Sequence, residues 1–415
     1  MWRCFALLLT VAVGAPAYAV EADFRLKWFG TATAYPEHDV VRLTEQSPQF
    51  DQSMDGRLML SGGGGGFEWV VHHASVLISG DAVARANRTN TSAAPDQIPT
   101  GDERRVMDLT WPIGDGKRHD AFHRFDRLAL KYRKGNWAVT LGREAVSWGS
   151  GRVFQPMDLF NPFAPTVVDR DFKAGDDLLH AQVLLGNGSD VELLAVGRRD
   201  VTGDITGTAG SVAAKLHGFA GGSEYEIMAA KHYRDRVYGL TLRIPIGGAL
   251  VRTDVVATDL GDGGWKTSGV LNIDYSFDVL QKNVYVFGEY FHNGFGVGRV
   301  ERVADLPQAL TDRLARGETF TLMRDYVALG GNVQWHALLT QNLTVLTNLH
   351  DSSSLLQTSL IYDPGDRQRL ELGMTLPMGR QGDEYGGINV ARLPDGRTAT
   401  TGGAARGFAR WVYYF

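Results

Sequence analysis

The chain has almost no cysteine, no long apolar run and no excess of positive charge. Its one cysteine, Cys4, lies in an N-terminal segment that we expect to be cleaved, so the mature protein needs no disulfide. No run of about 18 apolar residues follows that segment, which excludes a membrane-spanning helix there. With 42 lysines and arginines against 47 aspartates and glutamates, the chain is acidic, and nucleic acid is not expected as a partner.

The first 19 residues have the composition of a signal peptide. A single positive charge at Arg3 precedes an apolar run over 5–13, and Ala17-Tyr18-Ala19 forms a small-residue cleavage site. The apolar run is too short for a permanent membrane helix. The alternative is a buried N-terminal helix of a cytoplasmic protein. We predict that residues 1–19 are cleaved and that residues 20–415 form one domain.

The last eight residues, 408–415, are rich in aromatic side chains. Trp411, Tyr413 and Phe415 occupy alternate positions and therefore share one face of a strand. In water this face would be an exposed, adhesive edge, so a bilayer or a core must cover it. The ending resembles the terminal strand of bacterial outer-membrane β-barrels. The resemblance implies that these three residues are a signal read by the barrel-assembly machinery. It also implies periplasmic chaperones, outer-membrane lipid and lipopolysaccharide as partners.

Short segments of alternating apolar and polar residues fill the chain, and its 50 glycines argue against helices. A closed barrel spans a membrane with such segments because all its backbone groups pair. We therefore predict an all-β, antiparallel, up-and-down transmembrane barrel of about 18 strands, with 16 as the other possibility. A soluble β-sandwich is the alternative, but it would expose too much apolar surface. The predicted strands are 24–35, 56–61, 67–79, 122–133, 137–146, 177–187, 189–200, 210–219, 223–233, 236–245, 247–258, 266–277, 283–293, 323–337, 341–350, 354–363, 367–378 and 404–415.

The connections between these strands alternate between long and short, with exceptions near 234–235 and 351–353. Outer-membrane barrels have short periplasmic turns and longer extracellular loops. An even number of strands then places both termini in the periplasm and the protein in a Gram-negative outer membrane. Examples of the short class are 134–136, 220–222 and 364–366, and the long class includes 36–55, 80–121 and 147–176.

Within the predicted strands, charged residues oppose apolar ones. In 367–378, for example, Leu370 and Leu372 oppose Glu371. An arginine or lysine on the lipid face at mid-depth costs about 2–4 kcal/mol, so the charges belong inside. Barrels of about 16–18 strands enclose water, and basic wall residues favour anions modestly. We expect a water-filled channel without cofactor or metal. The predicted lumen residues are Arg127, Lys131, Arg133, Arg243, Arg252, Asp254, Asp274, Arg369 and Glu371.

The most distinctive internal segment is 141–163. It combines Gly142-Arg143, Trp148-Gly149 and the run Pro156-Met157-Asp158-Leu159-Phe160-Asn161-Pro162, and it leads into the third long connection. Its glycines, prolines and aromatics suit a loop that folds inward and narrows the channel. The pattern is similar to one in several poorly characterised Gram-negative outer-membrane families, including predicted porins. The alternative is a structural loop in which Asp158 and Asn161 cap turns. The predicted constriction residues are Arg143, Trp148, Arg152, Asp158, Asn161, Asp169, Arg170 and Asp171.

Charged residues continue beyond this segment with Lys173, Asp176 and Asp177. A calcium site is the alternative there, but the spacing of an EF-hand is absent, and we expect a solvated loop end. Arg143 and Arg152, together with Asp158 and Asp169, lead to the hypothesis of a transverse electric field across the constriction.

Two short motifs invite an enzymatic or metal-binding interpretation. His350-Asp351-Ser352-Ser353-Ser354 places base, acid and nucleophile types side by side, but catalysis assembles such groups from separated positions. A polar hairpin tip explains the motif better. His72 and His73 point to opposite faces of a strand and cannot readily share a metal.

The sequence thus predicts a porin-like outer-membrane channel, not an enzyme, for passive diffusion of small polar or anionic solutes. A homotrimer is the common assembly among porins. Three other functions stay open at this point. They are a barrel for polysaccharide export or surface assembly, a sheath for an electron-transfer partner and an outer-membrane hydrolase.

Overall fold

The computed structural model describes residues 20–89, 101–165, 167 and 172–415. The predicted signal peptide and three predicted constriction residues, Asp169, Arg170 and Asp171, therefore lie outside the described residues.

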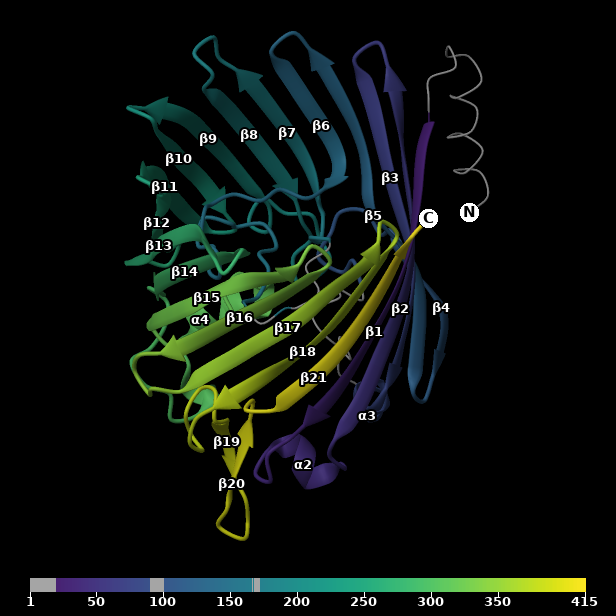
Figure 1. The fold of residues 1–415 in the computed structure, drawn as a ribbon, viewed down its shortest axis with the longest axis vertical. Coiled ribbons are helices and arrows are strands. Elements are labelled where there is room, and N and C mark those ends of the chain that lie inside the picture. Colours follow the sequence, from purple (N-terminus) through teal and green to yellow (C-terminus); the bar gives the residue numbers. More distant parts are fainter. Residues whose placement is uncertain (1–19, 90–100, 166, 168–171) are drawn as a thin grey trace.

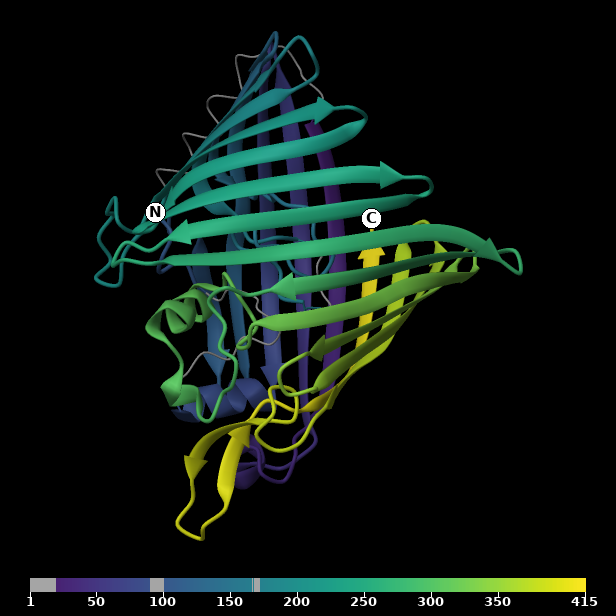
Figure 2. The ribbon, with the colours of Figure 1, turned by 90° about the vertical axis from the view of Figure 1, so that its left-hand side faces the viewer.

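The chain forms a closed antiparallel barrel of eighteen strands (Figures 1 and 2). Successive strands pair around the wall, and β21 pairs with both β18 and β1, which closes it. The barrel strands are β1 (Val20–Ala34), β2 (Gln49–Gly64), β3 (Phe67–Gly80), β5 (His119–Lys134), β6 (Trp137–Glu144), β7 (Asp176–Leu184), β8 (Asp190–Gly197), β9 (Ser211–Ala220), β10 (Ser223–His232), β11 (Asp235–Ile246), β12 (Ala249–Asp259), β13 (Trp265–Val279), β14 (Lys282–His292), β15 (Asp325–His336), β16 (Leu339–Asn348), β17 (Ser354–Gly365), β18 (Gln368–Met378) and β21 (Ala405–Tyr414).

Each of the eighteen predicted strands coincides with one of these, so the predicted fold is confirmed. The largest boundary difference is at β2, which begins at Gln49 instead of 56 and takes up part of the predicted connection 36–55. The helices and strands within the long connections were not predicted from the sequence. These are α2 (Val40–Thr44), α3 (Asp81–Thr89), β4 (Thr110–Gly116), η3 (Val303–Asp305), α4 (Gln308–Arg316), β19 (Ile388–Arg392) and β20 (Thr398–Thr401). Within the described ranges, no helix is long and apolar enough to cross a membrane.

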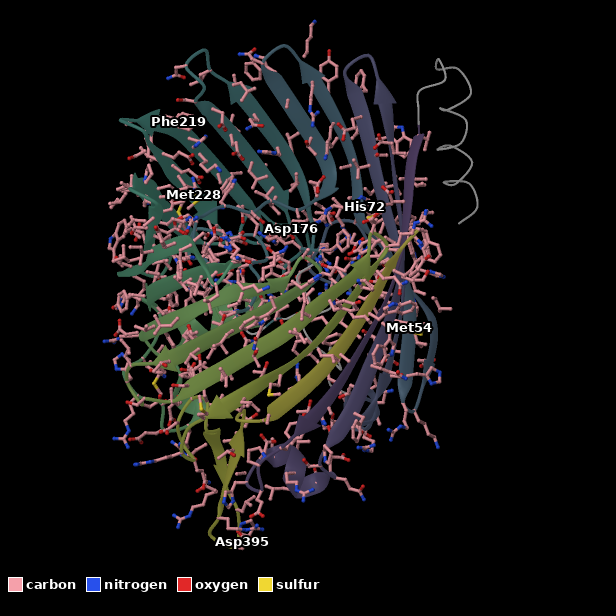
Figure 3. The ribbon with its side chains drawn as sticks, in the orientation of Figure 1. Met54, His72, Asp176, Phe219, Met228 and Asp395 are labelled. Atoms are coloured by element: carbon pink, nitrogen blue, oxygen red, sulfur yellow. The ribbon has the colours of Figure 1, made fainter. Side chains whose placement is uncertain are left out.

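The two ends of the barrel differ. One end, here the turn end, carries short turns such as residues 65–66, 135–136 and 221–222. The other, here the loop end, carries α2, α3, α4 and the β19–β20 hairpin, which projects from the rim with Asp395 at its tip (Figures 1 and 3). Strand β1 starts and β21 ends at the turn end.

Side chains alternate between the two faces of the wall. On β13, Leu271 and Ile273 are 55% and 52% exposed, whereas the intervening Asn272 is fully buried. Figure 3 shows the same division, with Met54 and Phe219 on the outer face and Asp176 inside. An apolar outer band and a polar interior are the pattern of a barrel that faces lipid.

The terminal strand closes the wall in register with β1, from Arg25 opposite Tyr414 to Ala34 opposite Ala405. Its inner face buries Phe408, Arg410 and Val412, and Phe415 is 65% exposed. The pairing of this strand with the predicted strand 24–35 is therefore confirmed, while the role of Trp411, Tyr413 and Phe415 as an assembly signal stays a prediction.

Candidate functional site

Residues 145–165, here called the crossing segment, leave the loop end of β6 and contact inner-face side chains of strands β11 to β14. The carboxylate of Glu289 on β14 accepts hydrogen bonds from three successive backbone N–H groups, those of Arg152 (2.6 Å), Val153 (3.0 Å) and Phe154 (2.8 Å). Asp254 on β12 accepts bonds from the backbone N–H (2.9 Å) and hydroxyl (2.7 Å) of Ser150. Two buried carboxylates thus hold the segment's backbone to the wall.

Apolar side chains strengthen this attachment. Phe154 stacks on Phe291 of β14, with ring centroids 4.2 Å apart. Trp148 packs edge-on against Phe160 at 5.4 Å and donates its indole N–H to Glu192 at 3.1 Å. Burial of aromatic rings and a satisfied indole N–H favour one fixed position of the segment.

Gly149 is required where the segment meets the wall. Its φ is +96°, which disfavours any side chain. A Cβ atom there would lie 2.9 Å from the Cβ of Met157 and 3.1 Å from the carboxylate of Asp254. The Trp148-Gly149 pair of the sequence motif therefore has a steric role in the seating of the segment.

Lys173 joins the start, the middle and the end of the connection between β6 and β7. The Lys173 ammonium donates to Asp158 Oδ1 at 2.7 Å and to the Ser147 hydroxyl at 3.1 Å. Burial raises the pKa of Asp158 to about 6, although the charge of Lys173 opposes this, and burial also lowers the pKa of Lys173. Asp158 also accepts the backbone N–H of Phe160 at 3.4 Å, so it acts within the loop and does not face a water-filled passage.

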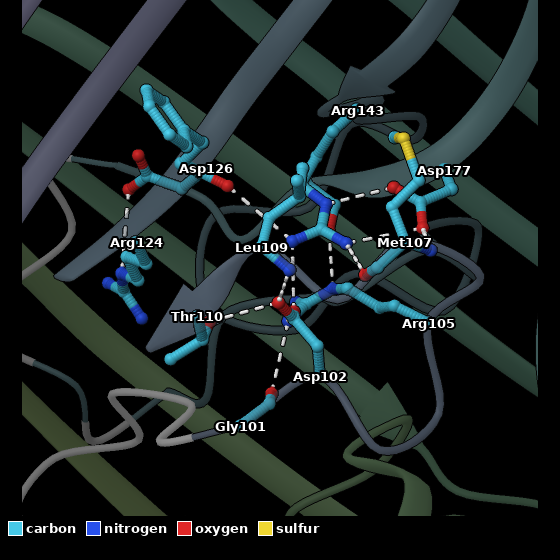
Figure 4. Close-up of polar contacts among 12 residues, drawn as sticks. Gly101, Asp102, Arg105, Met107, Leu109, Thr110, Arg124, Asp126, Arg143 and Asp177 are labelled. Atoms are coloured by element: carbon cyan, nitrogen blue, oxygen red, sulfur yellow. Dashed lines mark hydrogen bonds and ion pairs between the residues drawn. The ribbon is translucent and has the colours of Figure 1, made fainter. Parts of the chain in front are cut away.

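Arg143 is the centre of a second buried network, at the loop end of β6 (Figure 4). Its guanidinium donates to Asp177 Oδ1 at 2.8 Å, to Asp102 Oδ1 at 2.9 Å and to the Met107 carbonyl at 2.6 Å. Asp102 further accepts bonds from the Leu109 N–H and the Thr110 hydroxyl. Burial would raise the pKa of Asp102, but Arg105, the Leu109 N–H and Arg143 lower it overall. The network fastens residues 101–110 across the ends of β6 and β7.

The solvated loop end expected around Lys173, Asp176 and Asp177 is wrong. All three are buried, because Lys173 pairs with Asp158, Asp176 with Arg198, and Asp177 with Arg143. Ionic partners on β6, directly after β8 and in the crossing segment replace water around these charges. Within the described ranges, no group of three or more histidine, cysteine, aspartate or glutamate residues is arranged to hold a metal ion.

A row of arginines lines the opposite wall, on β1, β2 and β5. Arg25 and Arg57 lie directly opposite each other on paired strands, and both contact the carboxylate of Asp55, at 3.2 and 3.7 Å. The ring of Phe172 covers them, with its centroid 4.6 Å and 4.0 Å from the two guanidinium carbons. An aromatic face and a shared carboxylate reduce the repulsion between these two like charges.

A β-bulge adds further charge to this wall. The pairing of β3 with β5 changes from His73 opposite Phe125 to His72 opposite Arg127, which leaves Asp126 as the extra residue. Asp126 and Arg127 are consecutive and both buried, so the inner face changes parity here. Asp126 pairs with Arg57 at 2.6 Å, and Arg127 with Glu144 at 2.9 Å.

Between this wall and the loops lies a cavity of about 670 Å³. Residues 161–164 and 172–175 line one side of it, and residues 314–317 and 319–320 of the connection between β14 and β15 line another. Basic groups outnumber acidic ones by eight to three in its lining. The basic side chains are Arg25, Lys27, Arg57, Arg105, Arg124, Arg143, Lys173 and Arg316, and the acidic ones are Asp55, Asp102 and Asp126.

Most of the cavity's basic residues were not among the predicted site residues. Arg25 and Lys27 alternate with Phe24, Leu26 and Trp28, so a signal was present in the sequence. Arg124 could not be assigned in this way, because the bulge at Asp126 breaks the alternation that continues to Arg127. Arg105 and Arg316 lie in connections, where the sequence has no periodicity to interpret.

The other predicted residues occupy several places. Asn161 lines the cavity with φ +55°, and Arg152 reaches Asp274 at 3.7 Å on the far wall. Arg143 and Arg152 therefore do not share a partner, and the hypothesis of a field between them stays a prediction. The remaining wall residues lie on the inner face, in ion pairs. These pairs are Lys131–Glu144, Arg133–Glu68, Arg243–Glu226, Arg252–Asp274, Arg369–Asp363 and Arg410–Glu371.

The motif at 350–354 has no catalytic arrangement. Ser353 donates to Asp351 at 2.7 Å, whereas the His350 ring contacts Asp325 at 2.9 Å. His72 and His73 point to opposite faces, since His72 lies near Phe172 and His73 near His123.

Glu318 holds the loop between β14 and β15 over the cavity. It contacts His232 at 3.0 Å and Arg316 at 2.6 Å. Burial opposes ionisation of Glu318, but His232 and Arg316 lower its pKa to about 2. A lowered pKa stabilises the folded loop above the ordinary glutamate pKa, and this stabilisation is lost as the pH falls from about 4.5 towards 2.

We therefore expect amide hydrogen exchange in residues 308–320, corrected for the intrinsic rate at each pH, to be faster at pH 3 than at pH 7. The substitution Glu318→Gln should give fast exchange at both values. Equal corrected exchange at pH 3 and pH 7 in the wild type would contradict this role of Glu318.

No protein-family model and no curated protein sequence matches the chain. Solved structures do match along nearly its whole length. The outer-membrane protein OpdK of Pseudomonas aeruginosa, in a structure with vanillate, has a TM-score of 0.54 and 10% identity, over 95% of this chain and 98% of that one. OccK11 (OpdR) of P. aeruginosa has a TM-score of 0.52 and 10% identity, over 95% and 96%. OccAB1 of Acinetobacter baumannii has a TM-score of 0.53 and 9% identity, over 95% of this chain and 96% of that one. The chain has the fold of these barrels.

Proposed function

We propose that this protein is an outer-membrane channel for passive diffusion of small anionic solutes, and that the basic cavity is its selective site. In this proposal the turn end faces the periplasm and the outer face of the strands contacts lipid. Cleavage of residues 1–19, recognition of the terminal strand by the assembly machinery and a homotrimeric assembly belong to the same proposal.

The observation that carries this proposal is the charge of the cavity. Eight basic and three acidic side chains line it, although the whole chain has a net charge of −5. Positive charge collected inside a wall of low dielectric raises the local concentration of anions. Selectivity in such pores follows the sign of the lining charges.

Guanidinium groups also suit a particular kind of anion. Their planar donors match the two oxygens of a carboxylate, which a spherical ion such as chloride cannot exploit. OpdK, a barrel of the same fold, has a structure with vanillate, which is a carboxylate. We therefore propose small carboxylates as the preferred class.

The crossing segment supports a channel for small solutes over two other functions. It contacts the wall at Asp254 and Glu289, and residues 161–164 and 172–175 line the cavity. A sheath for an electron carrier needs a wide, unobstructed lumen. Polysaccharide export also needs a lumen wide enough for a polymer, whereas the crossing segment is attached inside the wall at β12 and β14.

Reversal potentials in planar bilayers test the proposed function. With a potassium chloride gradient, the wild-type channel should prefer chloride over potassium. Arg124→Gln should lower that permeability ratio by roughly twofold to fivefold, because one unit charge acts on an ion at 4 Å with about 1 kcal/mol in water.

Arg133→Gln is the matched control, since it removes the same charge from an exposed position at the turn end. It should change the ratio less than Arg124→Gln does. A wild-type protein that prefers cations, or one without conductance, would overturn the proposal.

A further inference from the structure

We propose a second anion-binding site, on the turn-end side of the crossing segment, formed by Arg152, Arg252 and Tyr285 and completed by Arg243. This proposal rests on the proposed channel function and adds a second station to the path. Its ligands are small carboxylates, the same class that we propose for the basic cavity. A solute would bind here before or after it passes that cavity.

The position of Arg152 follows from how its backbone is anchored. Its N–H is bonded to Glu289, while its guanidinium carbon lies 5.2 Å from the centroid of the Tyr285 ring. Tyr285 precedes Glu289 by four residues on β14 and is nearer the turn at 280–281. Four residues of a strand span about 13 Å. The Arg152 side chain therefore extends from the anchored segment towards the turn end.

The charges around Arg152 are not balanced one to one. Arg152 Nε lies 3.7 Å from Asp274 Oδ2, and Arg252 pairs with the same carboxylate oxygen. Arg252 also donates to the side-chain oxygen of Asn272 at 3.2 Å. Two guanidinium groups thus share one carboxylate. The nearby Glu289 carboxylate is engaged by backbone N–H groups and Asn272.

Arg243 adds positive charge beside this pair. It donates to Glu226 at 2.8 Å, to the half-exposed Glu224 at 3.4 Å and to the Gly149 carbonyl, in the crossing segment, at 3.4 Å. Arg152 remains 42% exposed, so its donors reach the water of the lumen. An exposed guanidinium held on an aromatic ring is preorganised for a planar anion.

The position of Asp274 indicates that a carboxylate fits between the two guanidinium groups. Its carboxylate already occupies a place between Arg152 and Arg252, with a side-chain exposure of only 11%. A solute carboxylate that approaches from the lumen would take up the free donors of Arg152 in competition with Asp274. Bidentate contacts between guanidinium and carboxylate are among the stronger hydrogen bonds in proteins.

The site is separate from the basic cavity. None of Arg152, Arg243, Arg252 and Tyr285 lines that cavity, whose crossing-segment residues are 161–164. Loop-end residues 314–317 and 319–320 line one side of the cavity, whereas Tyr285 and Arg252 lie near the turn ends of their strands. Because the two sites share no lining residue, a permeating anion would meet them as separate stations along its path.

Block of the chloride current by succinate, added to one side of a planar bilayer, tests this inference. Residues 20–415 contain no cysteine, so Asp395→Cys marks the loop end for an impermeant thiol reagent and gives the channel's orientation. With succinate on the turn-end side, Arg152→Gln and Arg252→Gln should each weaken the apparent affinity about tenfold, equivalent to about 1.4 kcal/mol. Block from the loop-end side should change less than twofold in these variants.

Asp274→Asn is expected to change the succinate block in the opposite direction. Loss of the internal competitor should strengthen block from the turn-end side, whereas a purely structural role of Asp274 would weaken it. Arg133→Gln, which removes a basic side chain elsewhere at the turn end, should leave the block unchanged. Arg152 lies outside the strands, so Arg152→Gln leaves the barrel wall unaltered. This variant alone tests the second site if Arg252→Gln does not fold.

The outcomes separate this site from the proposed function. If turn-end block is unchanged in Arg152→Gln while loop-end block still depends on Arg124, the second site is refuted and the channel function stands. If Arg152→Gln weakens block equally from both sides, there is no separate second site. A wild type that shows no anion current refutes the channel function itself.

Discussion

Replacement of Glu289 by alanine is expected to increase the single-channel conductance. The carboxylate accepts three backbone N–H groups of the crossing segment, at 2.6 to 3.0 Å. Hydrogen bonds to charged groups contribute about 1.5–3 kcal/mol each, so their loss removes the main attachment of residues 152–154. The stack of Phe154 on Phe291 and the bonds of Ser150 to Asp254 remain. We therefore expect transitions to a second current level, roughly twofold or more above the first, in planar-bilayer recordings.

Glu371→Ala is the control for this experiment. Glu371 is also a buried carboxylate of the inner wall, but it pairs with Arg410 on β21, away from the crossing segment. Its removal should leave the conductance level unchanged. Glu289→Gln keeps one acceptor oxygen and should give an intermediate frequency of the high level. A Glu289→Ala channel with wild-type conductance and no second level would show that the segment does not limit the current.

Replacement of Arg143 by alanine is expected to lower the free energy of unfolding by about 3–5 kcal/mol, the range for loss of one partner from a buried ion pair. The substitution leaves the carboxylates of Asp177 and Asp102 without the guanidinium that both contact, at 2.8 and 2.9 Å. It also frees the Met107 carbonyl. Urea unfolding in detergent micelles, followed by tryptophan fluorescence, measures the change.

Arg133→Ala controls for loss of an arginine from the same wall. Its side chain is 67% exposed and its contact with Glu68 is 3.6 Å long, so the expected change is below about 1 kcal/mol. Arg143→Lys should retain part of the stability, since lysine keeps the charge but not the planar donors. A loss below about 1 kcal/mol in Arg143→Ala would mean that water replaces the guanidinium and that the network does not hold residues 101–110.

The strands were predictable because a barrel wall imposes one rule along its whole length. On each strand, lipid selects apolar side chains for one face and water or ion pairs select polar ones for the other. Leu370, Leu372 and Glu371 show this rule in three consecutive residues. The helices and extra strands of the long connections obey no such rule. Their positions depend on contacts such as Asp102 with Arg143, which join residues 41 positions apart.

The site was only partly predictable for the same reason. Arg127, Arg252 and Asp274 were assigned to the inner face from alternation alone, and the structure places them there. The alternation does not predict the bulge at Asp126. One extra residue there moves every earlier residue of the strand to the opposite face from the one that the alternation assigns. Arg124 was missed in this way. Arg143 was assigned to the constriction, yet it is 2% exposed and acts within a buried network.

The sequence by itself determined the barrel, its strands, its closing pair and the inward direction of most charges, since each follows from alternation repeated over short segments. Only the tertiary structure decided which charges meet. Glu289 holds the crossing segment, Asp274 serves two arginines, and Arg25 and Arg57 share Asp55. Such pairings join distant parts of the chain, and their energy depends on distance and burial, which arise only once the wall has closed.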